Sequence, residues 1–128
     1  MTPDYASPEQ IRAQPLSTAS DLYSLGVVAF ELLAGARPYL LKRGTAAELE
    51  EAIDRIEPPL ASNVATDPAL RKALRGDLND ILNRALKKRP DDRYANVADF
   101  AQDLQRVASA IANRLGDEGM TRVWVETR

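Results

Sequence analysis

The sequence predicts an all-α protein, and three segments carry that prediction. Residues 18–34 are apolar on almost every side of a helix, which is typical of a helix buried in a core. Residues 45–48 read T-A-A-E, a capping box that opens another helix. From Asn96 onward, apolar residues recur every three or four positions for five turns. We therefore expect about five helices, with strand-like sequence confined to the C-terminal end.

The first two helices have boundaries that the sequence marks clearly. Ser7 suits the N-cap of a short helix, with Pro8 at its first position and Gln10 at its third. The next helix is expected near residues 18–34, and Gly35 ends it because glycine readily takes the left-handed backbone of a helix C-terminus.

The middle of the chain alternates between helix and connector. The helix that the capping box opens should stop before Pro58, since proline cannot continue a helix. Residues 57–75 are expected to be mostly a connector, with a short helix at 67–75. Asp77 then begins an amphipathic helix that Pro90 ends.

The C-terminal part divides at a glycine. The last helix is expected to run from Asn96 to Gly116. Residues 120–128 are rich in β-branched residues and include Trp124, so they predict either a strand or a loose tail. We therefore expect one domain over residues 1–116 and a tail over 117–128.

The composition excludes several classes of protein. With 17 basic and 19 acidic residues the net charge is −2, which favours neither nucleic acid nor an anionic membrane as a partner. The chain has no cysteine and no histidine, so it lacks thiolate ligands and the commonest general base. No apolar run approaches the roughly 18 residues of a membrane span. The expected location is the cytoplasm, and no metal site is expected.

Two runs near the N-terminus carry the signal for function. Residues 1–9 read M-T-P-D-Y-A-S-P-E, and residues 21–28 read D-L-Y-S-L-G-V-V. Together they resemble the end of the activation segment and the first core helix of a bacterial eukaryotic-type serine/threonine protein kinase. Residues 75–104 resemble the same family, so the resemblance covers roughly residues 1–106.

This resemblance implies both a fold and a parent activity. The fold is the lower part of a kinase C-lobe over residues 1–116. The activity of the intact parent is phosphoryl transfer from ATP, with Mg, to serine or threonine of a protein substrate.

The resemblance also assigns substrate-binding residues. Thr2, Pro3 and Tyr5 match the loop that forms the floor for the substrate residue after the phosphoacceptor. Thr2 further matches a threonine that bonds the catalytic aspartate and lysine of an upstream loop. Without the neighbouring motifs, a T-P-x-Y run is most simply a turn.

Four further residues match the structural motif of the family. Glu9 and Arg93 match a buried ion pair, although they lie 84 positions apart and only the family pattern connects them. Asp21 matches an aspartate that accepts backbone N–H bonds from the catalytic loop, but it also fits a simple acidic residue at a helix start. Gly26 matches a glycine that lets a neighbouring segment approach the helix.

The chemistry of the family is not found in these 128 residues. The six glycines are scattered, so no glycine-rich phosphate loop is present, and no V-A-I-K lysine or H-R-D loop can be found. Residues 99–101 read D-F-A, but Phe100 falls on the apolar stripe of the last helix, so this is not a metal-binding D-F-G. No catalytic residue is therefore assigned, and the chain alone is expected to bind no cofactor.

Two hypotheses about function remain open at this stage. The chain is either the C-lobe part of an active kinase, useful only with its upstream half, or a stand-alone, catalytically dead interaction module. A kinase half would need the missing N-lobe and catalytic loop as its partner. A chain without them should self-associate as a symmetric homodimer, because the helix at 18–34 would keep uncovered apolar residues: Leu22, Leu25, Phe30, Leu32 and Leu33 cannot all be buried. Exchange of residues 1–10 between the two protomers is one route to such a dimer.

Overall fold

The computed structural model describes residues 5–15, 17–39 and 44–127. Within these ranges the chain forms helices and no strand, as the sequence predicts. In chain order the elements are α1 (Pro8–Ile11), α2 (Thr18–Ala34), α3 (Ala46–Arg55), α4 (Ala61–Val64), α5 (Pro68–Leu74), α6 (Asp77–Ala85), the 3-10 helix η2 (Pro90–Asp92) and α7 (Val97–Thr127).

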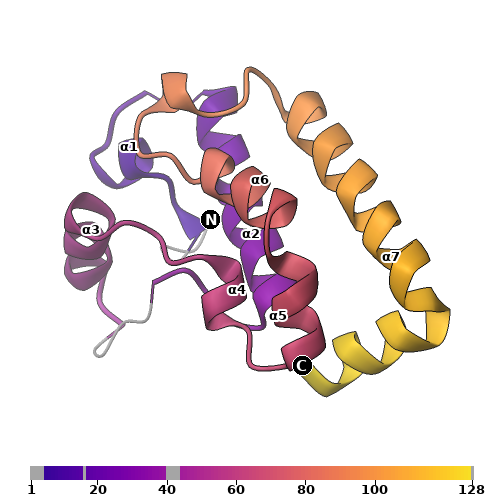
Figure 1. Cartoon of the computed structure of the whole chain (residues 1–128). Coiled ribbons are helices and arrows are strands. Elements are labelled where there is room, and N and C mark those ends of the chain that lie inside the picture. The colour runs from indigo at the N-terminus through magenta and orange to yellow at the C-terminus, as the bar shows by residue number, and fades with distance from the viewer. Residues whose placement is uncertain (1–4, 16, 40–43, 128) are drawn as a thin grey trace.

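Helix α2 is the centre of the fold. It packs against α4, α6 and α7, and Figure 1 shows it behind α6, with α7 along the right-hand side. The residues it contributes to the core are almost completely inaccessible to water: Leu22, Tyr23, Val27 and Phe30. The apolar residues of 18–34 therefore form the central helix of the core, as the sequence predicts, because three other helices pack against it.

Gly26 lies where α6 crosses α2. A Cβ atom at position 26 would stand 2.9 Å from the Cβ of Ala85 and 3.3 Å from Cδ2 of Leu86. A side chain at position 26 would not fit beside Ala85, so the glycine allows α6 to approach α2 this closely.

One face of α2 stays open to solvent. Leu22, Phe30 and Leu33 are buried, but Leu25, Val28 and Leu32 are 43, 40 and 56% exposed. The last three lie at helical spacing and form one apolar stripe, named the α2 stripe from here on. As expected from the sequence, the helices present cannot cover every apolar residue of α2.

Local signals place most of the helix ends. Ser7 and Gln10 form a complete capping box at the start of α1, and Gly35 ends α2 with a φ of 83°. Thr45 accepts a hydrogen bond from the N–H of Glu48 at the start of α3. The connector at 57–75 contains the expected short helix as α5, and also the additional single-turn helix α4.

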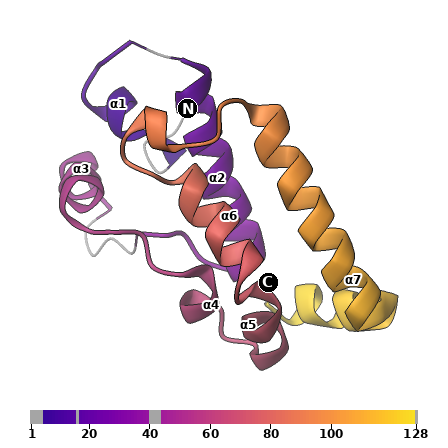
Figure 2. The same ribbon diagram turned by 45° about the horizontal axis from the view of Figure 1, so that its top comes forward.

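The C-terminal prediction was wrong in two respects. Helix α7 does not end at Gly116, and residues 120–127 form neither a strand nor a tail but continue the helix to Thr127. Figures 1 and 2 show that α7 changes direction in its last part. A glycine inside a helix costs only about 1 kcal/mol, which does not compel an end. A strand needs a partner for its backbone groups, and the described residues offer no other strand.

No helix in the described part of the chain is both long enough and apolar enough to cross a membrane.

Candidate functional site

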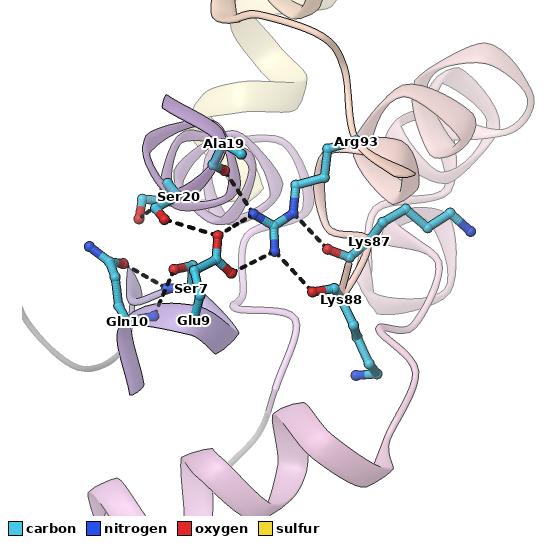
Figure 3. Close-up of polar contacts among 9 residues, drawn as sticks. Ser7, Glu9, Gln10, Ala19, Ser20, Lys87, Lys88 and Arg93 are labelled. Carbon is cyan, nitrogen blue, oxygen red and sulfur yellow. Dashed lines mark hydrogen bonds and ion pairs between the residues drawn. The ribbon is translucent and has the colours of Figure 1, made fainter. Parts of the chain in front are cut away.

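Glu9 and Arg93 form a buried, two-pronged ion pair. Nη1 of Arg93 lies 2.7 Å from Oε2 of Glu9, and Nη2 lies 2.9 Å from Oε1 (Figure 3). Glu9 is 5% exposed and Arg93 is 3% exposed. Parallel bonds of this kind match the planar guanidinium to the carboxylate in direction as well as in charge.

The remaining hydrogen-bonding groups of the pair are also satisfied. Arg93 donates from Nη1 to the carbonyl of Ala19 at 2.8 Å, from Nε to that of Lys87 at 2.7 Å and from Nη2 to that of Lys88 at 3.2 Å. The Ser20 hydroxyl donates to Oε2 of Glu9 at 2.9 Å. The pair therefore joins α1, the first turn of α2 and the segment between α6 and α7 at one point.

The protonation of Glu9 follows from these bonds. Burial alone would raise the pKa of the Glu9 carboxyl, but the hydrogen bonds from Arg93, from its own backbone and from Ser20 outweigh burial. The pKa of Glu9 therefore lies below its ordinary value of 4.5, and the group is held as a carboxylate.

Tyr23 lies under the same guanidinium. The carbon centre of the Arg93 guanidinium stands 4.9 Å from the centre of the Tyr23 ring, within the range of a cation–π contact. Burial raises the pKa of the Tyr23 hydroxyl. That hydroxyl lies near the one of Tyr39 but makes no hydrogen bond of good geometry within the described residues. The aromatic ring thus supplies one wall of the buried ion-pair site.

Tyr5 is fixed to the C-terminal end of α2. Its hydroxyl donates to the Glu31 carboxylate at 3.0 Å, and Arg37 pairs with that carboxylate at 2.9 Å. The Arg37 guanidinium also lies over the Tyr5 ring, 5.3 Å from its centre. Thr2 and Pro3, the other substrate-loop residues that the resemblance assigns, lie outside the described residues.

Asp21 and Gly26 occupy separate positions on α2. The Asp21 side chain is exposed on the first turn of the helix, where an acid also suits the helix dipole. Gly26 lies five residues further along, at the contact with α6. The structure therefore brings Glu9 and Arg93 together and leaves Asp21 free of the buried cluster.

Sequence reasoning missed the residues that complete both clusters. Ser20 completes the buried pair, and Glu31 and Arg37 hold Tyr5. A serine in the first turn of a helix and a charged pair at a helix end are common on protein surfaces, so their residue types alone carry no signal.

Of the D-F-A run at 99–101, Phe100 packs in the core, as predicted, whereas Asp99 and Ala101 are exposed. Phe100 is buried and its ring lies 5.6 Å from that of Tyr94. The N–H of Asp99 donates to the Asn96 side chain at 2.8 Å as part of the start of α7. Among the described residues, no group of three or more acidic side chains gathers as a metal site would require.

The chain belongs to the protein kinase family. The family model for the protein kinase domain matches residues 1–106, and that range contains the buried pair, Tyr5, Asp21 and Gly26. The described residues form helices and no strand, which agrees with the lower part of a kinase C-lobe.

Three similar proteins are bacterial serine/threonine kinases. Serine/threonine-protein kinase Pkn1 of Myxococcus xanthus is 40% identical over 104 residues, which are 81% of this chain and 14% of that protein. Serine/threonine-protein kinase PknB of Mycolicibacterium smegmatis is 33% identical over 106 residues, 83% of this chain and 16% of that protein. A probable serine/threonine-protein kinase of Clostridium acetobutylicum is 31% identical over 119 residues, 93% of this chain and 17% of that protein. The chain thus spans less than a fifth of the length of these relatives.

Proposed function

We propose that this chain is the substrate-loop part of a serine/threonine protein kinase C-lobe. In the intact parent it works with an upstream half that binds ATP and Mg and carries the catalytic loop. The observation that supports this role most strongly is the buried Glu9–Arg93 pair, because it anchors the segment that follows residues 1–5 to the central helix. Such an anchor is useful where a loop must hold a fixed position for catalysis.

The resemblance suggests a role for the residues of the N-terminal segment and for Asp21. Thr2, Pro3 and Tyr5 form the floor beneath the substrate residue that follows the phosphoacceptor. Glu31 and Arg37 hold the Tyr5 ring in place by the bonds described above. Asp21 is exposed, so its carboxylate is accessible to backbone N–H groups of the upstream catalytic loop.

The α2 stripe supports the need for an upstream half. Leu25, Val28 and Leu32 present an apolar face that the helices of this chain do not cover. Apolar faces of this kind favour association with another protein surface. The upstream half of the kinase is the partner we propose for it.

Self-association is the second candidate for covering the α2 stripe. The stripe has only three exposed large side chains, whereas a stable interface usually buries about 800 Å² per partner. A homodimer, with or without exchange of residues 1–10, would therefore be weak. Gel filtration with light scattering at tens of micromolar distinguishes a 14.1 kDa monomer from a dimer.

A chimeric kinase tests the proposed function. In Pkn1, the segment matched over 104 residues is replaced by the corresponding segment of this chain. We expect the chimera to transfer phosphate from ATP to serine or threonine of a protein substrate, because the upstream half supplies the chemistry that this chain lacks. The isolated chain, assayed in parallel, should transfer none and should bind no Mg-ATP in titration calorimetry.

Two results would contradict the proposal. One is a chimera that unfolds cooperatively, and is therefore folded, yet transfers no phosphate. The other is saturable micromolar binding of Mg-ATP to the isolated chain, which would place nucleotide chemistry within these residues.

A further inference from the structure

Helix α3 stands apart from the main core. Its inward-facing residues Leu49, Ala52 and Ile53 are buried, but none of them belongs to the core cluster built by α2, α4, α5, α6 and α7. Figures 1 and 2 both show α3 at the edge of the molecule beside α1. Its burial therefore depends on a small local contact surface and not on the central core.

Helix α3 is also weak as a helix on its own. It has 10 residues, whereas isolated helices shorter than about 12 residues are marginal in water. Four of its residues are acidic and one is basic, so like charges crowd its surface. Contacts with the rest of the molecule must hold it in place.

Lys88, which follows α6, supplies charge-assisted hydrogen bonds among these contacts. Its ammonium group donates to the carbonyl oxygens of Ile53 and Ile56 at the C-terminal end of α3, the latter at 2.8 Å, and lies 3.5 Å from the Tyr39 hydroxyl. These carbonyls belong to the last turn, where intrahelical partners are lacking and a cation suits the helix dipole.

The position of Lys88 is itself fixed by the buried site. Its own carbonyl accepts a hydrogen bond from Arg93 at 3.2 Å, so the anchor of α3 is attached to the Glu9–Arg93 pair. Among the described residues, a further polar attachment of α3 is the ion pair between Arg12 and Asp54, whose side chains are both exposed. Exposed pairs contribute little, so Lys88 is the stronger of these two polar attachments.

From these contacts we propose that Ala46–Ile56 form a flap that opens independently of the rest of the fold, and that Lys88 holds it closed. Opening breaks the bonds from Lys88 to the helix end and exposes the apolar face of α3 together with the side of α1 that it covers. Helix α1 keeps its position during this motion, because the Glu9–Arg93 pair holds it to α2 without the help of α3. The flap is a conformational device next to the proposed substrate loop.

Hydrogen exchange on the complete chain tests the proposal, with Lys88→Met compared with Lys87→Met. Methionine keeps most of the apolar stem and removes the donors, and the neighbouring Lys87 side chain is exposed. We expect Lys88→Met to lower the protection of α3 amides about tenfold or more, as the loss of charge-assisted hydrogen bonds requires. Protection in α2 and α6 should stay unchanged, and Lys87→Met should leave all three helices unchanged.

Exchange of the unmodified chain at low guanidinium concentrations provides a second, independent measurement. Amides of α3 should exchange through openings that depend less on denaturant than those of α2, because the flap exposes less surface than global unfolding. The proposal is overturned if α3 amides exchange with the same opening free energy, and the same dependence on denaturant, as the amides of α2 that exchange through global unfolding. It is equally overturned if Lys88→Met leaves α3 protection unchanged or lowers protection in α2 and α6 to the same extent.

Discussion

At the scale of single residues, the Glu9–Arg93 pair is the contact on which the N-terminal segment depends. A buried charge is tolerated only with a partner and with its remaining bonds satisfied, and both conditions hold here. The pair is nevertheless vulnerable, because removal of either partner leaves the other charge buried alone.

Arg93→Ala should therefore lower the free energy of unfolding by about 3–5 kcal/mol. Urea unfolding measures this change, and Arg89→Ala, at an exposed position four residues away, is the matched control. An Arg93→Ala midpoint equal to that of the control would mean that the ion pair contributes nothing to stability.

The same pair gives stability a defined dependence on pH. The pKa of Glu9 is lowered in the folded chain, so its contribution is complete above about pH 4.5 and is lost as the pH falls through the lower folded value. Arg93→Ala should lose less stability at acid pH than the parent chain. Without the hydrogen bonds from Arg93, burial is opposed less strongly, so the pKa of Glu9 in the folded chain is no longer lowered as far. Equal acid slopes in both proteins would exclude Glu9 as the group responsible.

At the scale of secondary-structure elements, local sequence predicted most of the helices and few of the contacts between them. Ser7, Gly35 and Thr45 act within one turn of their own position, so caps and helix ends could be placed from sequence. The end at Gly116 failed because a glycine ends a helix only where the chain turns left-handed, and tertiary context decides that.

The candidate site, too, could be predicted from the sequence only in part. Glu9 and Arg93 are 84 positions apart, so no local rule connects them, and only the family resemblance suggested the pairing. The carbonyls of Ala19, Lys87 and Lys88 complete the site through backbone atoms, and a backbone acceptor leaves no trace in residue type. Contacts of this kind become visible only in three dimensions.

The crossing of α2 and α6 gives a prediction at this scale. Gly26→Ala would gain about 1 kcal/mol in helix propensity, but its Cβ would stand 2.9 Å from that of Ala85, and overpacking costs about 1–3 kcal/mol. We expect net destabilisation of up to about 2 kcal/mol in urea unfolding. In a double-mutant cycle with Ala85→Gly, the two changes should compensate each other in part. A Gly26→Ala protein more stable than its parent would show that α6 does not approach α2 so closely.

At the scale of the whole molecule, the described residues form a buried core and leave the α2 stripe exposed. The core formed by α2, α4, α5, α6 and α7 is dense enough to bury most of the large apolar side chains of the described residues. The α2 stripe is the exception on the central helix, and the chain spans only a small fraction of the kinases it resembles. The exposed α2 stripe supports the proposal that another segment of a kinase covers the central helix.

The most direct test of this account places the same substitutions in two settings. Leu25→Asp and Leu32→Asp are introduced into the isolated chain and into the Pkn1 chimera, and thermodynamic stability is measured by urea unfolding. In the isolated chain both side chains already face water, so we expect losses below about 1 kcal/mol. In the chimera the upstream half should cover the α2 stripe, so each buried aspartate should cost more than about 4 kcal/mol and abolish kinase activity. A chimera that tolerates both substitutions with its stability and activity intact would contradict the account.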